Sequence, residues 1–200
     1  MEVKIKLNGR AVAADVPADT LLIDFVRAHG CASVKRGCET SACGLCTVLL
    51  DGTPVLSCSV LAARADGHAV QTLEGLQEEA SEFVGFIADQ GAEQCGFCNP
   101  GFVMNTIALL RENPDPTDEE ILAYLSGNLC RCSGYVGQLR GIRNFLDSRN
   151  AAAEAAAAGE AQAAAAGETE TEAAAPVATA AAGVPAAADA APATKGGARG

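Results

Sequence analysis

The first seven residues alternate between polar and apolar side chains. Val3, Ile5 and Leu7 share one face of an extended chain, with charged residues between them, which is the pattern of a strand with one buried face. Asn8-Gly9 comes next, a dipeptide that favours a two-residue hairpin turn. The chain is therefore predicted to open with a β-hairpin whose second strand is Arg10–Val16.

The pattern after the hairpin predicts one short helix and three more strands within the first 75 residues. Asp19 or Thr20 is expected to cap the helix, and its apolar side is formed by Leu21, Leu22, Phe25 and Val26. The strands follow a loop rich in Gly and Cys and are expected at Thr47–Leu50, Pro54–Leu56 and Ala69–Thr72. The first two are joined by an Asp51-Gly52 turn. These elements describe a small α+β domain over residues 1–75.

Apolar residues in the second half recur at helical spacing instead. Glu82–Gln90 is predicted to be helical, and Gly91 is suited to the position just after a helix end. Asn99 is expected to cap a second helix, with Pro100 in its first turn. Asn113-Pro114 is expected to end that helix.

Two further helices are predicted before residue 150. Thr117–Glu120 has the sequence of a capping box. A last helix is expected over Tyr135–Ser148, although Gly137 and Gly141 each lower its intrinsic preference by about 1 kcal/mol relative to alanine. Its inward side is expected to hold Val136, Leu139, Ile142, Phe145 and Leu146. Together the four helices predict a four-helix bundle domain over residues 76–150.

The composition changes at residue 151. About half of residues 151–200 are alanine, and they include no aromatic residue, Leu, Ile or Cys. Such a segment cannot bury enough apolar surface to offset its ordering entropy. It is predicted to be a disordered tail, with transient helix near Ala151–Ala166 because alanine favours helix. A linker or an interaction tail is the alternative.

The net charge and the pattern of the first residues limit the classes of partner and the cellular compartment that are expected. The net charge of -11 over 200 residues argues against a nucleic-acid or anionic-membrane surface. The first residues lack the basic start and apolar run of a signal peptide, and no membrane-spanning stretch is visible outside the alanine-rich tail. A cytoplasmic location is therefore expected, where thiols stay reduced. Nine cysteines in such a chain point to metal or redox cofactors before disulfides.

A first set of four cysteines has the spacing C-x4-C-x2-C, followed after eleven residues by a fourth: Cys38, Cys43, Cys46 and Cys58. The first three match the plant-type [2Fe–2S] spacing. Gly37 and Gly44 allow the loop to fold tightly. Zinc is the competing metal, since C-x4-C lies within the range of zinc knuckles.

A second set pairs C-x2-C with a distant C-x-C: Cys95, Cys98, Cys130 and Cys132. Each pair precedes a predicted helix start, where free N–H groups favour negative charge. Zinc is a stronger rival here, but the C-x-C pair is unusual for zinc and favours iron–sulfur. Because the two spacings differ, the sets are not copies of one repeat.

The remaining candidate residues carry no clear chemistry. Cys31 stands outside both sets and is expected to be a partly buried free thiol. His29 and His68, the only histidines, lie in no metal-binding pattern. Neither a phosphate-binding glycine loop nor a catalytic triad is visible, so no catalytic residue is predicted.

Taken together, the two sets resemble a known family. Residues 37–48 (GCETSACGLCTV), Cys58, residues 94–101 (QCGFCNPG) and residues 127–135 (GNLCRCSGY) resemble the small iron–sulfur subunit of the xanthine dehydrogenase and carbon monoxide dehydrogenase type of molybdenum hydroxylases. The resemblance covers about residues 1–147. It includes all eight ligand positions in order, and so favours iron–sulfur over zinc in both sets.

This resemblance implies a ferredoxin-like β-grasp domain followed by a helical domain, each with one [2Fe–2S] cluster. It implies that Gln94 and the Cys132 segment contact a molybdopterin held by a large partner subunit. Electrons would then cross the helical-domain cluster and the β-grasp cluster to FAD on a medium subunit. Two residues depart from the family pattern: Ser41 stands where Gly is frequent, and Asn99 where Thr is frequent.

Three functions are compared on this basis. The leading one is an electron-transfer subunit with two [2Fe–2S] clusters inside a molybdenum-dependent oxidoreductase, with the substrate site on another subunit. A zinc-stapled interaction module and a stand-alone ferredoxin-like carrier are the alternatives. The second cysteine set disfavours the stand-alone carrier, since such a carrier needs only one cluster.

Overall fold

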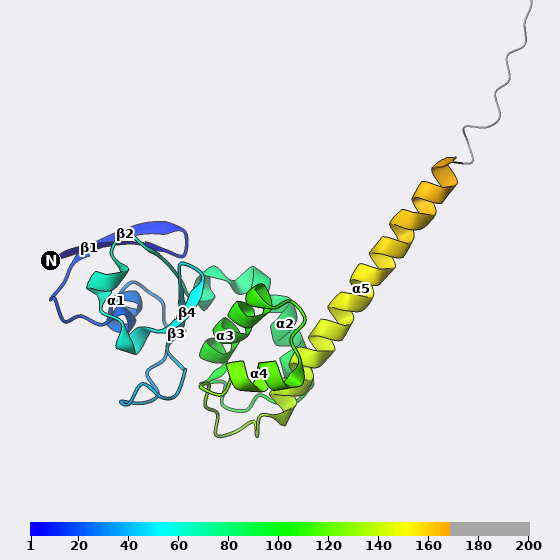
Figure 1. The fold of residues 1–200 in the computed structure, drawn as a ribbon. Helices are drawn as coiled ribbons and strands as arrows, with labels where there is room; N and C mark the ends of the chain where they lie inside the picture. Colours follow the sequence, from blue (N-terminus) through cyan, green and yellow to red (C-terminus); the bar gives the residue numbers. More distant parts are fainter. Residues whose placement is uncertain (169–200) are drawn as a thin grey trace, which may run out of the picture. The chain divides into compact units, whose positions relative to one another are not determined.

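The computed structural model describes residues 1–168 (Figure 1). Met1–Ala155 form one compact unit, and the chain from Ala156 onward is separate from it. Among the described residues, no helix is both long and apolar enough to cross a membrane. The first unit contains every cysteine of the chain.

The N-terminal half contains a five-stranded mixed sheet in the order β2-β1-β5-β3-β4. Its strands are β1 (Glu2–Leu7), β2 (Arg10–Asp15), β3 (Thr47–Leu50), β4 (Thr53–Leu56) and β5 (Ala69–Gln71). Strands β1 and β5 run parallel, whereas the other neighbours are antiparallel. All five predicted strands are confirmed, and the α+β class with them.

Both predicted hairpin turns are present. Asn8 and Gly9 have φ values of 49° and 82°, and Asp51 and Gly52 have 48° and 85°. Two consecutive residues with positive φ are the requirement of the tight turn whose twist matches the flanking strands. These local sequences therefore determine the register of β1 on β2 and of β3 on β4.

Helix α1 (Leu22–Ala28) starts without a side-chain cap, so the predicted cap at Asp19 or Thr20 is wrong. Backbone groups of residues 60–62 bond to the backbone at the start of the helix instead. The N–H of Leu22 donates to the carbonyl of Val60 at 2.7 Å, and the N–H of Ala62 donates to the carbonyl of Thr20 at 2.8 Å. Three single-turn 3₁₀ helices complete this half: η1 (Ser57–Ser59), η2 (Ala62–Ala65) and η3 (Leu73–Gly75).

The C-terminal half of the unit is helical, as predicted. Its elements are α2 (Gln77–Asp89), α3 (Asn99–Glu112), α4 (Asp118–Tyr124) and α5 (Val136–Glu168). Helix α2 starts at Gln77 rather than Glu82 because its first turn also packs: Leu76 and Ala80 are buried in the helical core. Gly91 follows α2 with a φ of 60°, as its position predicts.

The ends of α3 and α4 test two capping predictions. Cys98, not Asn99, is the N-cap of α3, and its carbonyl accepts from the N–H of Phe102 at 3.1 Å. The predicted cap at Asn99 is therefore wrong. The capping box of α4 is confirmed: Glu120 donates its N–H to the Thr117 hydroxyl, and its carboxylate accepts from the Thr117 N–H at 2.7 Å.

Helix α5 departs from its prediction at both ends. Val136 is 64% exposed rather than inward-facing, and the helix continues past Ser148 through the alanine-rich segment to Glu168. Gly137 and Gly141 are compatible with this helix because they permit close packing. A Cβ at Gly141 would lie 2.5 Å from Ile87 of α2. Residues 169–200 of the predicted tail lie outside the described part of the chain.

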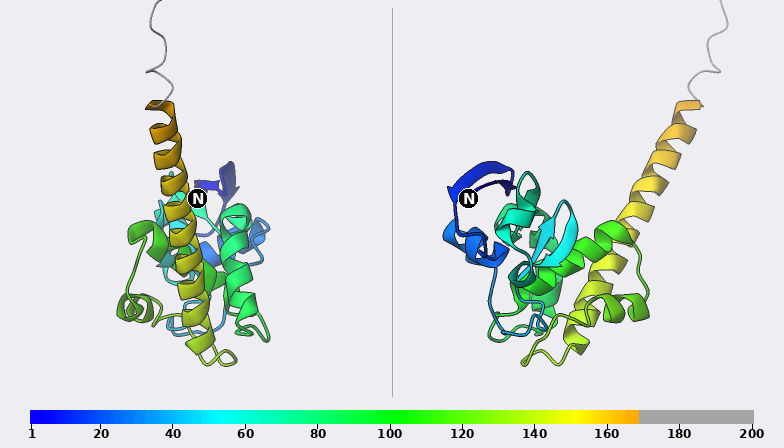
Figure 2. Two further views of the ribbon diagram at one scale, coloured as in Figure 1. Left: turned by 90° about the vertical axis from the view of Figure 1, so that its right-hand side faces the viewer. Right: turned by 60° about the vertical axis from the view of Figure 1, so that its left-hand side comes forward.

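Strand β3 joins the two halves of the unit. Val48 belongs to the core of the sheet and α1, whereas Leu49 belongs to the helical core, and both are fully buried. Neighbouring side chains of a strand point to opposite faces, so β3 contributes to both cores. Helix α3 packs against β3 and β4 (Figure 2). This is the side of the sheet on which Leu49 joins the helical core. This contact places the start of α3 beside the first cysteine loop.

Candidate metal centres

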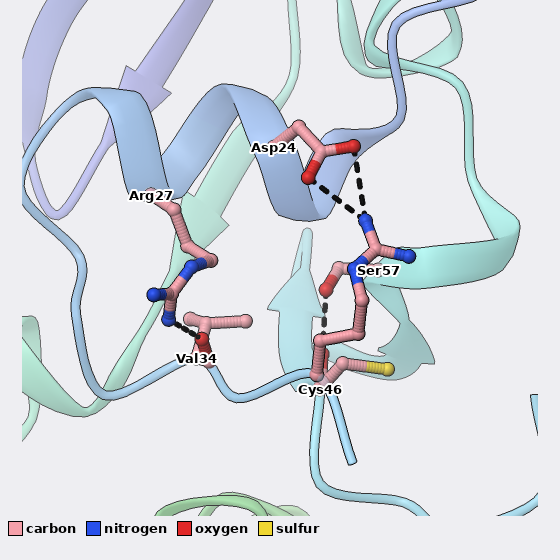
Figure 3. Close-up of polar contacts among 6 residues, drawn as sticks. Asp24, Arg27, Val34, Cys46 and Ser57 are labelled. Atoms are coloured by element: carbon pink, nitrogen blue, oxygen red, sulfur yellow. Dashed lines mark hydrogen bonds and ion pairs between the residues drawn. The ribbon is translucent and has the colours of Figure 1, made fainter. Parts of the chain in front are cut away.

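The loop that carries the first cysteines is tied to α1. Arg27 donates to the carbonyl oxygen of Val34 at 2.5 Å, and Arg36 forms an ion pair with Asp24 at 2.8 Å (Figure 3). Each contact joins the helix to the loop before Cys38. The segment leading into the cysteines is thereby held against a packed helix.

A second anchor brings Cys58 to this loop. Ser57, which is fully buried, donates its hydroxyl hydrogen bond to the carbonyl oxygen of Cys46 at 2.7 Å (Figure 3). Its neighbour Cys58 lies in η1, directly after β4. The buried hydrogen bond from the Ser57 hydroxyl to the Cys46 carbonyl thus holds Cys58 beside Cys46.

Backbone N–H groups surround the Cys38 sulfur. N–H donation from Ala42, the thiol of Cys43 and N–H donation from Thr40 lower the pKa of Cys38 to about 6. Ser41, between the two donors, has a left-handed φ of 57°. Hydrogen bonds to the ionised form are the cause of this low pKa, so the loop is built to hold a negative sulfur.

The pKa values of the other three thiols in the first set are also shifted, two of them upward and one downward. Burial raises the pKa of Cys43, and burial raises that of Cys46 to about 11. Burial also opposes ionisation of Cys58, but hydrogen bonds from Ser41 and the Cys46 thiol outweigh it and lower the Cys58 pKa. Cys46 and Cys58 therefore form a pair in which the pKa of one sulfur is lowered and that of the other is raised.

The second set lies at the start of α3 and in the loop before α5. Burial disfavours the Cys130 thiolate, yet the hydroxyl and N–H of Ser133 and the N–H of Cys132 lower its pKa to about 7. The two N–H contacts measure 3.3 and 3.4 Å. The phenol oxygen of Tyr135 accepts from the Cys130 N–H at 2.9 Å, which fixes the same loop.

Two close pairs form within this set. The thiol of Cys132 donates to the sulfur of Cys95 at 3.6 Å. The N–H of Phe97 and this thiol lower the Cys95 pKa, and the same pairing raises that of Cys132. Burial, followed by the neighbouring Cys130, raises the pKa of Cys98 to about 12.

All eight cysteines thus fall into four pairs with one low-pKa and one high-pKa sulfur each. The pairs are Cys38 with Cys43, Cys46 with Cys58, Cys95 with Cys132 and Cys98 with Cys130. Among residues 1–168, no three His, Cys, Asp or Glu side chains converge as ligands of a single ion. A tetrahedral zinc site needs four ligands on one ion, whereas each iron of a [2Fe–2S] cluster takes two thiolates. The donor set therefore fits two binuclear clusters.

One cleft of about 510 Å³ gathers most of these sulfurs. It is lined by the whole second set together with two cysteines of the first, namely Cys38, Cys43, Cys95, Cys98, Cys130 and Cys132. The two predicted sets thus approach one another around a shared opening. Sequence spacing alone did not indicate this proximity.

A contact made largely of backbone groups joins the two sets. The N–H of Leu129 donates to the carbonyl oxygen of Cys43 at 2.9 Å, and the buried Asn128 amide donates to the carbonyl oxygen of Gly44 at 3.2 Å. A Cβ at Gly101 of α3 would lie 2.5 Å from that same Gly44 oxygen. Sequence reasoning missed the roles of Asn128 and Gly101 because they depend on contacts between distant segments.

The other residues singled out from the sequence each have a partner within the chain. Gln94 donates its amide to the Cys132 carbonyl at 3.0 Å. Cys31 is buried in the N-terminal core, where the Asn8 amide lies 3.6 Å from its sulfur. His29 pairs with the Phe25 carbonyl and His68 with Asp51, so both histidines have partners unrelated to the two cysteine sets.

Two family models match overlapping parts of the chain. Residues 5–81 match the 2Fe-2S iron-sulfur cluster binding domain, and residues 72–143 match the [2Fe-2S] binding domain. Iron–sulfur chemistry in both halves is thereby confirmed, and the zinc alternative is wrong.

Curated relatives show where such chains are used. The nicotinate dehydrogenase small FeS subunit of Eubacterium barkeri is 44% identical over 137 residues, which cover 67% of this chain and 87% of the relative. The chain belongs to the small [2Fe–2S] subunits of the xanthine dehydrogenase family of molybdenum hydroxylases. The xanthine dehydrogenase iron-sulfur-binding subunit of Escherichia coli O157:H7 is also 44% identical, over 66% of this chain and 86% of the relative.

Solved structures agree with this membership. Quinoline 2-oxidoreductase from Pseudomonas putida 86 matches with a TM-score of 0.69 and 35% identity, covering 74% of this chain and 94% of that one. The predicted fold is confirmed, as is the predicted role of an electron-transfer component of an oxidoreductase. This small [2Fe–2S] subunit therefore works as one part of an oxidoreductase complex.

Proposed function

We propose that the chain relays single electrons from a molybdopterin centre on a large subunit to FAD or another acceptor on a medium subunit. The single observation that carries this proposal is the pairing of all eight cysteines in two adjacent sets. Two sets in one chain suit a relay with an entry and an exit. The proposed parts are a β-grasp domain over residues 1–75, a helical domain over 76–150 and a tail over 151–200.

The proposed ligands are Cys38, Cys43, Cys46 and Cys58 for one cluster, and Cys95, Cys98, Cys130 and Cys132 for the other. When bound, each cluster supplies a one-electron carrier. The protein lowers the cost of ionising one sulfur in each pair, as at Cys38 and Cys130. The second sulfur of each pair would also be held as a thiolate in the loaded protein, since iron requires that form.

Backbone groups connect the two ligand sets. Leu129 directly precedes Cys130, and its N–H donates to the carbonyl of Cys43. A chain of bonds from the Cys43 sulfur to the Cys130 sulfur therefore contains one hydrogen bond and is otherwise covalent. This short connection supports transfer between the two centres within the subunit.

The open side of the cleft supports a partner at the helical set. Phe97, Leu129 and Tyr135 line the cleft and remain 46%, 48% and 42% exposed. Exposed apolar side chains grouped beside polar ones indicate a surface that another protein covers. By resemblance, this is the large subunit, with Gln94 contacting the molybdopterin while its amide supports Cys132. The complex is proposed to work in the cytoplasm, where the thiols stay reduced before loading.

The proposal is tested on the full chain purified anaerobically with its partners. Iron, zinc and acid-labile sulfide are measured per chain, and EPR spectra are recorded after reduction. About four irons and four sulfides with two distinct signals are expected, together with copurifying large and medium subunits. Zinc without sulfide contradicts the proposed ligation, and a lone chain with two clusters and no partners contradicts the relay in favour of a free carrier.

A further inference from the structure

Ser41 contacts a cysteine that is distant in sequence. Its hydroxyl oxygen lies 3.5 Å from the sulfur of Cys58, across from the end of β4. Ser41 is itself exposed and lies in the loop between Cys38 and Cys43. The contact thus joins the two chain segments that supply the first cysteine set.

The backbone of Ser41 indicates that this contact has a cost. Its φ of 57° is left-handed, a conformation that is unfavourable for an L-residue and that glycine adopts freely. The turn itself is needed, because it directs the N–H groups of Thr40 and Ala42 at the Cys38 sulfur. Glycine would make this turn without strain, so the turn alone does not explain a serine. The hydroxyl is the group that remains to be explained.

The direction of this hydrogen bond follows from the state of the sulfur. The free thiol of Cys58 stands in for an iron-bound thiolate, which has no proton and can only accept. The Ser41 hydroxyl must then be the donor. Ser59 also approaches the same sulfur, at the longer distance of 3.7 Å.

A donor at a ligand sulfur acts on the reduction potential. Reduction adds negative charge to the cluster and its sulfurs, so a hydrogen bond stabilises the reduced form more than the oxidised form. Loss of the donor therefore lowers the potential. The effect is local because the hydroxyl contacts one sulfur of one set.

We propose that Ser41 is a positioning residue that raises the reduction potential of the N-terminal cluster by donating a hydrogen bond to the Cys58 sulfur. This inference rests on the proposed ligation by Cys58. It increases the tendency of the N-terminal cluster to accept the electron that leaves the helical set. Ser41 thereby favours flow of electrons toward the β-grasp half.

The test compares Ser41→Ala, Ser41→Gly and Ser59→Ala in the full chain with its partners. Each variant is titrated with a set of redox mediators, and the two EPR signals are followed separately. Ser41→Ala keeps the Cβ and removes the hydroxyl, whereas Ser41→Gly also relieves the strained φ. Ser59→Ala is the matched control, since it removes the more distant hydroxyl from the same sulfur.

Both Ser41 variants are expected to lower the ratio of reduced to oxidised N-terminal cluster at a fixed ambient potential, by up to tenfold. A tenfold fall corresponds to about 59 mV for a one-electron couple. The helical cluster should not shift, and Ser59→Ala should shift the N-terminal signal less. An unchanged potential in Ser41→Ala overturns the proposal, as does a shift in Ser41→Gly alone, which would assign the effect to the backbone.

The iron and sulfide content distinguishes failure of this proposal from failure of the proposed relay. Four irons, two signals and an unmoved potential in Ser41→Ala would reject the role of Ser41 and leave the relay intact. Absence of iron and sulfide in the unsubstituted protein would reject both. If Ser41→Ala fails to load its cluster, Ser41→Gly, whose backbone favours the native φ, is titrated in its place, and an unchanged potential there overturns the proposal.

Discussion

The backbone N–H of Leu129 donates to the carbonyl oxygen of Cys43 at 2.9 Å. These residues are far apart in the sequence, yet each is at or next to a cysteine of a different set. The buried side chain of Asn128 supports this link through Gly44, and its own oxygen accepts from the Asn105 amide at 2.7 Å.

Replacing Asn128 with Ala should weaken the link without removing a ligand. The carbonyl of Gly44 and the amide of Asn105 lose a buried partner, which costs about 1–3 kcal/mol of stability. Both clusters should remain, but thermal bleaching of their visible absorbance should occur at lower temperature. Asn144→Ala, on the exposed face of α5, is the control. Equal melting of the two variants would contradict a structural role for Asn128.

Gly101→Ala should disturb the first cysteine loop. The added Cβ would lie 2.5 Å from the Gly44 oxygen and 2.9 Å from the Leu45 Cα, both backbone atoms, so the loop must shift. Overpacking of this kind typically costs about 1–3 kcal/mol. Chemical denaturation followed by circular dichroism measures the loss.

The matched control is Gly85→Ala in α2, where nothing lies within 4 Å of the new Cβ. Alanine favours the helix interior over glycine by about 1 kcal/mol, so this variant should gain stability. A gain at both positions would show that Gly101 is not closely packed in solution.

Replacing Cys43 with Ser should abolish one EPR signal and leave the other. A serine hydroxyl is a poor substitute for the thiolate, and the second set lies on other segments. Cys31→Ser is the control, because Cys31 belongs to neither proposed ligand set and its sulfur lies 3.6 Å from the Asn8 amide, and it should keep both signals. Retention of both signals in Cys43→Ser would contradict the proposed ligand set.

The thiols of cluster-free protein should differ in reactivity with pH. The thiolate is the reactive form, so Cys38, with a pKa near 6, should be alkylated by iodoacetamide at pH 7 and lose reactivity as the pH falls below about 6. Cys46, with its pKa raised to about 11, should react only at high pH. Peptide mapping by mass spectrometry gives both rates. Identical pH profiles would show that the loop does not hold this geometry without metal.

Deletion of residues 151–200 should leave both clusters intact. All eight paired cysteines lie in the compact unit that ends at Ala155, and the core residues Ile142 and Leu146 of α5 are retained. Iron content and the two EPR signals of the truncated chain are the measurements. Loss of a cluster would assign the alanine-rich segment a structural role.

Local signals explain what the sequence could predict. The alternation of Val3, Ile5 and Leu7, the Asn8-Gly9 turn and the capping box at Thr117 act over a few residues, and each appears in the structure as expected. The cysteine spacing favoured iron–sulfur in both sets but left zinc open, and the resemblance to the family decided between them.

Features that depend on partners distant in sequence are the ones that local patterns do not predict. Helix α1 needs no side-chain cap because Val60 receives its first N–H. The two glycines of α5 lower its intrinsic helix propensity, but they allow close contact with Ala92 and Ile87. The proximity of the two cysteine sets depends on α3 packing on β3, which no local pattern encodes.

The contact between the two sets consists mainly of peptide groups and glycines. Cys43, Gly44, Gly101 and Leu129 contribute backbone atoms, and Asn128 adds one amide. The main-chain part of this contact does not change when outer side chains are replaced. The separation between the two redox centres is therefore a property of the main chain rather than of the side chains around it.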